Sequence, residues 1–377
     1  MAVGELGLFI RVVSEDSGAK AAKDMVMSQI QISKRPFSEV DINDPFFDSL
    51  KAAYRGFEPW FTRKAEELAY VGYDDDGKVR AFVYLKRENE TVTDVTPPIL
   101  GPCLKVGTLK IDAHGTRLGE RFVKIIFDEL RHQELSLAYV TIFREQERLI
   151  SLLERYGFIA DGRKGDELVY TKRMPTRTGN PLFDYPVVRA TGVHKWMLAI
   201  RPDFHTRLFP DSILHNESPD IIQDVPETNG IHKVYIGRMF DFPLLSPGDC
   251  LIIYRCQNAR AGRPWFQSVA TSLCVLEEIR PKGDFPNEAD FLAYCKKYSV
   301  FSDAEIINQY RAPGNLHALK MTYNFAFPRR PNLQRMVEHG AVPHPREGQY
   351  MGLLGLSDEA FSTILRLGGI DERLAVY

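Results

Sequence analysis

The sequence has little excess charge and few cysteines, and both facts narrow the kind of protein it can encode. Its 48 basic and 50 acidic residues leave a formal net charge of -2. No global field therefore attracts nucleic acid or membranes, and any anion site must be local. The five cysteines include no Cys-x-x-Cys pair. This argues against a metal site such as structural zinc and favours buried free thiols in a reducing cytoplasm.

Long apolar runs are missing too. No stretch approaches the roughly 20 apolar residues that a membrane-spanning helix needs, and the first residues lack the basic start and apolar core of a signal peptide. We therefore expect a cytoplasmic protein with no membrane partner. The length of 377 residues, with 44% hydrophobic side chains, favours two domains.

The first half of the chain alternates helical and extended patterns. Apolar residues at helical spacing in 44–67 predict two helices broken near Gly56 and Pro59. DDDG between two alternating segments predicts a hairpin. The pattern then predicts a strand at 104–111, a helix after HGTRLG, a strand at 135–143, a helix ending at Gly157 and a last strand in ELVYTKRM. It stops at Pro175.

Two motifs stand at the starts and ends of these helices. HGTRLG at 114–119 places two glycines before one helix, where unpaired amide protons and partial positive charge suit a phosphate. LLERYGF at 152–158 ends the next helix. In this order the motifs resemble the acyl-CoA loop and the closing helix of the GNAT acetyltransferases. The resemblance implies an α/β fold, a GNAT-like mixed sheet with helices, as an acetyltransferase domain at 1–175.

The resemblance implies acetyl-CoA as the acetyl donor. Its pantetheine arm would lie between two parallel strands that separate, 104–111 and 135–143, and its pyrophosphate on the loop. Two loop positions depart from the family pattern, which usually has Arg or Gln at His114 and Gly at Arg117. The side chains of Arg121 and Lys124 could add charge. The cofactor-binding residues implied are Ile111, His114, Gly115, Thr116, Arg117, Leu118, Gly119 and Glu120.

Acetyl transfer to an amine needs a proton acceptor, an oxyanion stabiliser and an acid for the departing thiolate. Asp112, at the end of the strand, is the best-placed carboxylate for the base, with His114 behind it. A turn or cap role for Asp112 is at least as good an interpretation. Leu153 stands where many family members have an acidic tyrosine, and Tyr156 falls on another side of its helix, where we expect packing. Water also serves as base in this family.

The segment YRGFEPWF falls where this fold usually selects its acceptor. Its rings, Tyr54, Phe57, Trp60 and Phe61, could stack on a flat acceptor such as a base, at about 1–3 kcal/mol per base. Aromatic residues at helical spacing more often fill a core, and this interpretation is the stronger one.

The second half follows a linker at 176–188 that is rich in Pro, Gly and Thr. Short strands, an SPGD turn and one long helical segment then resemble a PUA-like domain of the ASCH or EVE kind. This implies an α+β PUA-like β-barrel domain at 189–377. The Gly-x-Lys-x-x-Glu-x-Arg stretch of ASCH proteins is not recognisable near RPDFHTRLFPD, so we do not expect the hydrolase activity of some ASCH proteins.

The PUA-like resemblance implies RNA or another nucleic acid as a partner. We expect phosphate contacts from three arginines, Arg255, Arg329 and Arg330, here called the arginine set. Alternation places Tyr323, Phe325 and Phe327 on one strand face, more often an interior face.

Three functions stay open at this point. The first is an acetyl-CoA-dependent N-acetyltransferase whose PUA-like domain selects an RNA or other nucleic-acid-linked acceptor. The second is a protein or small-amine acetyltransferase that uses the barrel for docking. The third is a GNAT-fold binding or regulatory protein without catalysis. The sequence leaves the acceptor and the oligomeric state open.

Overall fold

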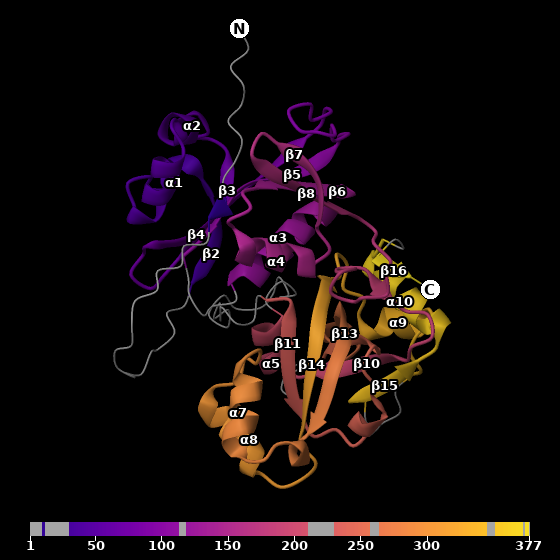
Figure 1. The fold of residues 1–377 in the computed structure, drawn as a ribbon. Coiled ribbons are helices and arrows are strands. Elements are labelled where there is room, and N and C mark those ends of the chain that lie inside the picture. Colours follow the sequence, from indigo (N-terminus) through magenta and orange to yellow (C-terminus); the bar gives the residue numbers. More distant parts are fainter. Residues whose placement is uncertain are drawn as a thin grey trace. The chain divides into compact units, whose positions relative to one another are not determined.

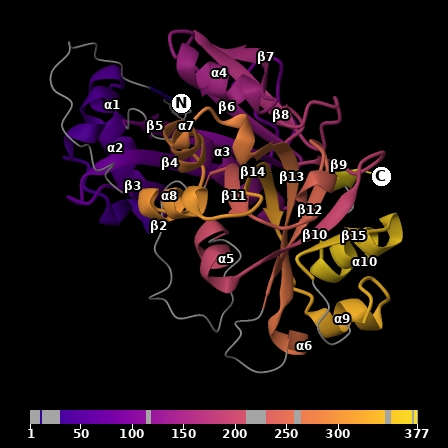
Figure 2. The same cartoon turned by 90° about the horizontal axis from the view of Figure 1, so that it is seen from below.

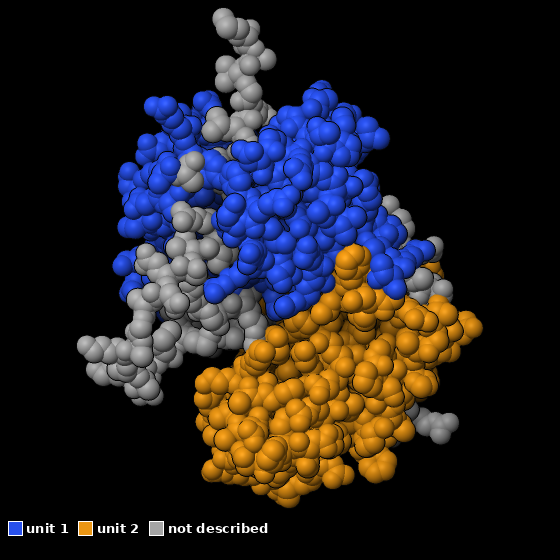
Figure 3. Space-filling model, viewed as in Figure 1, with its two compact units in different colours: residues 1–178 blue, residues 179–377 orange. Residues whose placement is uncertain are grey.

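The computed structural model describes residues 10–11, 30–112, 118–209, 230–256, 264–344, 351–371 and 374–376. The chain divides into two compact units, residues 1–178 and residues 179–377, which Figure 3 shows in different colours. Each unit has its own mixed sheet, with helices and an apolar core.

Unit 1 is built on a sheet of eight described strands, in the order β2-β3-β4-β5-β6-β8-β7 with β1 paired to β5 (Figure 1). The pairs β5–β6 and β1–β5 are parallel, and the other neighbours are antiparallel. The strands are β1 (Ile10–Arg11), β2 (Gln31–Pro36), β3 (Leu68–Tyr73), β4 (Val79–Glu88), β5 (Cys103–Ile111), β6 (Leu137–Ile142), β7 (Ile159–Lys164) and β8 (Glu167–Arg173). The helices are η1 (Phe37–Glu39), η2 (Pro45–Phe47), α1 (Asp48–Ala53), α2 (Phe57–Arg63), α3 (Leu118–His132) and α4 (Glu147–Arg155).

Local chemistry explains the expected breaks and turns. Gly56 separates α1 from α2 with a left-handed backbone, φ 104°, which glycine adopts without a Cβ penalty. In the β3–β4 hairpin, the Asp74 carboxylate accepts hydrogen bonds from the backbone amides of Asp76 and Lys78, and Gly77 has a left-handed φ of 74°. The hairpin and the helix break at Gly56 are confirmed, whereas Pro59 lies within the first turn of α2.

Two apolar clusters cover parts of one sheet face. The larger packs aromatic rings from η1, η2, α1 and α2 against β3 and β4, with Phe37 and Phe82 ring centroids 5.3 Å apart. The smaller joins Val95 and Ile99 of the 89–102 connection to Cys103, Tyr139 and neighbouring strand residues. Burial of one large apolar side chain stabilises the fold by about 1.5–3 kcal/mol. Helix α3 lies against β4, β5 and β6 and packs on α4.

Unit 2 has a six-stranded path in the order β11-β14-β13-β12-β10-β15, and a separate β16-β9 pair. The strands are β9 (Val188–Arg189), β10 (Lys195–Ile200), β11 (His232–Gly237), β12 (Cys250–Arg255), β13 (Val269–Pro281), β14 (His317–Ala326), β15 (Leu353–Leu356) and β16 (Ala375–Val376). The helices are α5 (Pro202–Leu208), η6 (Phe242–Leu244), α6 (Pro264–Gln267), η7 (Lys282–Asp284), α7 (Glu288–Lys296), α8 (Asp303–Arg311), α9 (Leu333–Glu338) and α10 (Asp358–Gly368).

The closed barrel expected for unit 2 is not seen in the described residues. Strands β11 and β15 end the path and do not pair with each other there. The four-residue strand β15 is followed directly by α10, which packs on β13 and β15. Figures 1 and 2 show α7 and α8 toward the β11 end and α9 and α10 toward the β15 end. The finding is a mixed sheet with helices.

Two expectations from the sequence, on the cysteines and on membrane-spanning helices, can be compared with this fold. All five cysteines are free, and four of them are buried. Within the described ranges, we find no helix with the length and apolarity needed to cross a bilayer.

Candidate functional site

The parallel strands β5 and β6 pair briefly and then separate. The ladder joins Leu104–Val106 to Ala138–Val140. Beyond it, Thr141–Ile142 continue the β6 ladder with β8, and no described residue of β6 pairs with Gly107–Ile111 of β5. We call this opening between the carboxyl-terminal halves of the two strands the strand split.

A bulge in β5 coincides with the start of the strand split. The β4–β5 register shifts after Tyr84, which pairs with Thr108, while the next residue of β4 pairs with Val106. Gly107 is therefore the extra residue. A Cβ on Gly107 would lie 2.5 Å from the Tyr84 ring and 2.9 Å from its carbonyl oxygen, so the ring approach requires glycine. A bulge bends its strand, and β5 leaves β6 at this residue.

Part of the open β5 edge carries another strand of the same chain. Ile10 and Arg11 of β1 pair in parallel with Leu109 and Lys110. The edge therefore accepts an extended segment through its backbone groups.

The predicted acyl-CoA residues fall at both ends of a short gap in the description. Ile111 ends β5, and Leu118, Gly119 and Glu120 begin α3. His114, Gly115, Thr116 and Arg117 lie outside the described residues. A Cβ on Gly119 would meet Cδ2 of Leu152 in α4 at 2.8 Å, so this glycine also serves the packing of α3 on α4.

Two further cations of α3 contact groups within unit 1. Arg121 is buried and donates to the Ile30 carbonyl at 2.9 Å. Lys124 is buried and pairs with Asp128 at 2.6 Å. These contacts give both side chains a structural role, apart from the phosphate role that the sequence suggested.

The predicted base continues the β4–β5 ladder. The Asp112 amide donates to the Arg80 carbonyl at 2.9 Å. Its carboxylate lies 3.9 Å from the ammonium of buried Lys110, which also donates to Ser49 Oγ at 2.7 Å. This geometry gives Asp112 a structural reason for its position. His114, its predicted companion, is among the residues that the structure leaves undescribed.

Other predicted positions are packed. Leu153 of α4 and Tyr156, the residue just after that helix, are fully buried. Phe57, Trp60 and Phe61 are buried in the larger aromatic cluster, which is the core role that helical spacing favoured. Their neighbour Tyr54 is half-buried and stacks on Phe143, just after β6, with centroids 6.3 Å apart.

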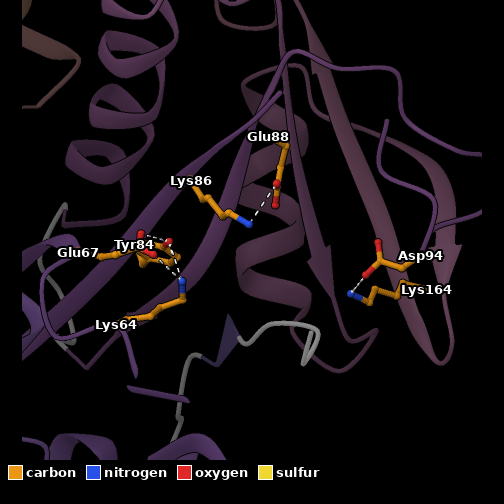
Figure 4. A network of polar contacts seen from close by, with 7 residues as sticks. All are labelled: Lys64, Glu67, Tyr84, Lys86, Glu88, Asp94 and Lys164. Atoms are coloured by element: carbon orange, nitrogen blue, oxygen red, sulfur yellow. Dashed lines mark hydrogen bonds and ion pairs between the residues drawn. The ribbon is translucent and has the colours of Figure 1, made fainter. Parts of the chain in front are cut away.

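Sequence reasoning missed a band of charge across the sheet face (Figure 4). At one end, Lys64 contacts Glu67 at 2.9 Å and the Tyr84 hydroxyl at 3.1 Å. Burial raises the pKa of Glu67, but hydrogen bonds from Tyr84 and Lys64 outweigh it and lower that pKa below its ordinary value. The band continues through two ion pairs, Lys86–Glu88 at 3.2 Å and Lys164–Asp94.

Two members of this face are buried charges, Lys105 of β5 and Glu167 of β8, 7% exposed each. Burial raises the pKa of Glu167 to about 7, although a Thr141 hydrogen bond and the charges of Lys164 and Lys105 oppose the rise. Burial and then the Lys164 charge lower the pKa of Lys105. The Lys105 ammonium lies 5.9 Å from the Tyr139 ring centroid.

Register places these groups on one face near the strand split. Lys105 pairs with Lys86 on one side and Tyr139 on the other, and register partners project to the same face. Glu167 lies two residues before Val169, the partner of Thr141. The sequence contained a signal for this placement. The two-residue period of a strand puts Lys105 and Glu167 on the same strand face as buried residues of β5 and β8.

The arginine set lies in unit 2, where the charges of two of its members act on one histidine. His205 of α5 is fully buried, and its Nε2 lies 2.8 Å from Thr271 Oγ1. Burial, followed by the charges of Arg255 and Arg330, lowers the pKa of His205 to about 3. Arg329 is exposed, and its amide donates to the Gly368 carbonyl at 2.9 Å.

Comparisons with known proteins give two kinds of structural neighbour. No protein-family model matches the sequence, and no curated protein does. ASCH from Zymomonas mobilis is 15% identical with TM-score 0.31, covering 46% of this chain and 94% of that one. An IAA acetyltransferase from Bacillus cereus is 12% identical with TM-score 0.29, covering 38% and 99%. A GNAT family acetyltransferase from Elizabethkingia anophelis, with acetyl-CoA bound, is 10% identical with TM-score 0.29, covering 39% and 99%.

Proposed function

We propose that unit 1 is an acetyl-CoA-dependent N-acetyltransferase. The observation that carries this proposal is the strand split. Two parallel strands part at the Gly107 bulge, and α3 begins at Leu118, shortly after β5 ends at Ile111. This is the arrangement that the resemblance to the GNAT acetyltransferases, carried by the motifs at 114–119 and 152–158, implies.

The residues present suit the chemistry of acetyl-CoA. The open edge of β5 offers peptide groups to an extended amide-bearing chain, as its pairing with β1 illustrates. The first turn of α3 offers amide protons and partial positive charge to a pyrophosphate. Glu120 in that turn is acidic, so backbone groups would have to outweigh its repulsion of a phosphate.

In the proposed reaction, an amine nitrogen attacks the thioester carbon. A carbon–nitrogen bond forms, the carbon–sulfur bond breaks, and the thiolate takes a proton. The amine proton passes to a carboxylate or to water. Asp112 and His114 are the acceptors predicted from the sequence, and the buried charge of Glu167 adds a carboxyl whose pKa, about 7, suits general base catalysis near neutral pH.

For unit 2 we propose that the arginine set binds an RNA or other nucleic-acid-linked acceptor. The charges of Arg255 and Arg330 both lower the pKa of His205, which supports a local basic site in a protein without net positive charge. A domain that holds the acceptor raises its effective concentration at the thioester. The alternatives are a protein or small-amine acceptor and a non-catalytic binding protein.

Calorimetry of the full chain with acetyl-CoA tests the proposal for unit 1. We expect binding, and release of the CoA thiol when amines are added. A Gly119→Val variant should lose binding. Because this change also meets Leu152, the double variant Gly119→Val/Leu152→Ala serves as the control that relieves the helix contact. Absence of heat and of thermal stabilisation at millimolar acetyl-CoA would leave the non-catalytic alternative.

A further inference from the structure

Lys105 and Glu167 are both enclosed in unit 1, yet neither has an ion-pair partner within the described residues. The Glu167 Oε1 atom is buried and, within those residues, accepts no hydrogen bond. A buried charged group without compensation is costly, because it loses its water without gaining an equivalent partner. Such a group persists where a ligand supplies the missing contacts.

The neighbouring charges show which partners are already used. Lys86 pairs with Glu88 at 3.2 Å, and Lys164 pairs with Asp94. The field of Lys105 reaches Glu167, but no hydrogen bond or ion pair joins the two. One cation and one anion are thus left over from a band in which the other charges are matched.

Both groups stand beside the strand split. Lys105 lies in the last paired segment of β5, two residues before the Gly107 bulge. Glu167 forms a side-chain hydrogen bond with Thr141. Thr141 lies in the part of β6 that no longer pairs with β5. A molecule at the split would meet a carboxylate from one side and an ammonium from the other.

We propose that Lys105 and Glu167 form the acceptor site, and that the acceptor is an amine with an anionic group, carboxylate or phosphate, a few bonds from its nitrogen. This inference rests on the proposed function. The Lys105 ammonium binds the anion. Glu167 accepts one proton from the substrate ammonium and releases it to solvent. The freed nitrogen then attacks the thioester carbon, the carbon–sulfur bond breaks, and the second proton lost by the nitrogen passes through Glu167 to the departing thiolate.

Matched amines test this specificity in the full chain. The probes are β-alanine against propylamine and O-phosphoethanolamine against ethanolamine, measured by calorimetry without acetyl-CoA and by thiol release with it. We expect one anionic amine to bind about tenfold or more tighter than its neutral counterpart, as for charge-assisted hydrogen bonds. Whether β-alanine or O-phosphoethanolamine is preferred identifies the anion as carboxylate or phosphate.

Three variants assign the preference to residues. Lys105→Met should remove the preference for the anionic amine over its neutral counterpart, and Glu167→Gln should weaken every amine. Lys86→Met is the matched control. Lys86 is the register partner of Lys105 on the neighbouring strand, and its ammonium already pairs with Glu88. Thermal melts verify that each variant folds.

The outcomes separate this inference from the proposed function. Equal use of anionic and neutral amines, or an equal loss in Lys86→Met and Lys105→Met, would overturn the acceptor site while turnover upheld the transferase. The expected amine binding without any binding or turnover of acetyl-CoA would support the site and overturn acetyl transfer.

Discussion

The buried carboxyl of Glu167 should make the stability of unit 1 depend on pH in a direction opposite to most acidic groups. Its pKa is raised from an ordinary value of 4.5 to about 7 in the folded protein, mainly by burial. Folding therefore favours the protonated form. The contribution to stability is complete below pH 4.5, falls as pH rises through the folded value, and is lost above about pH 7.

The magnitude follows from the two pKa values. One pKa unit corresponds to about 1.36 kcal/mol, so the rise from 4.5 to about 7 is worth at most about 3.4 kcal/mol. We expect about 2 kcal/mol after solvent screening. The variant Glu167→Gln keeps the shape and cannot ionise, so the wild type should lose about this much relative to the variant between pH 4.5 and 8.

Urea unfolding of both proteins at pH 4.5, 6 and 8 measures this difference. Trp60 is the tryptophan of unit 1, whereas Trp196 and Trp265 belong to unit 2. A background with both of the latter changed to Phe makes fluorescence report on unit 1 in the full chain. Other titrating groups cancel in the difference. A wild-type minus variant difference that stays constant with pH would show that Glu167 is not raised as argued.

Three further changes address the other parts of the molecule. Gly119→Val should lower stability by about 1–3 kcal/mol through its contact with Leu152, and Leu152→Ala should restore stability without restoring acetyl-CoA binding in calorimetry. Proline at both Ile10 and Arg11 removes the β1 backbone donors, so acetyl-CoA should bind more tightly if it uses the same β5 edge; unchanged affinity would refute that overlap. Glutamine at all three positions of the arginine set should weaken RNA binding, reduce its salt slope by about 2 and leave acetyl-CoA affinity unchanged. If the wild type and the triple variant bind RNA equally at each of two salt concentrations, the arginine set is not the RNA site.

The elements of unit 1 were predictable where local chemistry is strong. DDDG, Gly56 and the four-residue apolar spacing after Leu118 each specify a turn, a break or a helix without tertiary help. Strand β2 and strand β7 were missed. β2 contains only exposed and half-buried residues and lies at a sheet edge, and β7, at the other edge, carries three charged residues. Weak burial leaves little apolar pattern in such edge strands.

The candidate site was less predictable because it depends on register. The motif at 114–119 drew attention to the carboxyl end of β5, but four of the seven residues of the band in Figure 4 come from β4 and β7. Glu167 and Lys105 are 62 positions apart in sequence, and their shared face follows from the β5–β6 and β6–β8 ladders. The alternation of apolar residues in each strand indicates that Lys105 and Glu167 face inward. It does not indicate that the two side chains face the same opening.

The Gly107 bulge connects the two parts of the proposed site. Because the extra residue lies on β5, Tyr84 and Lys86 of β4 stay on one face while β5 keeps Thr108 and Lys105 opposite them. The same bulge marks where β5 leaves β6, so the opening that would admit a thioester starts beside the buried lysine. A variant that fills this position, Gly107→Ala, would press on the Tyr84 ring and its carbonyl. It should therefore disturb the donor edge and the acceptor charges together, whereas Lys105→Met should affect the acceptor alone.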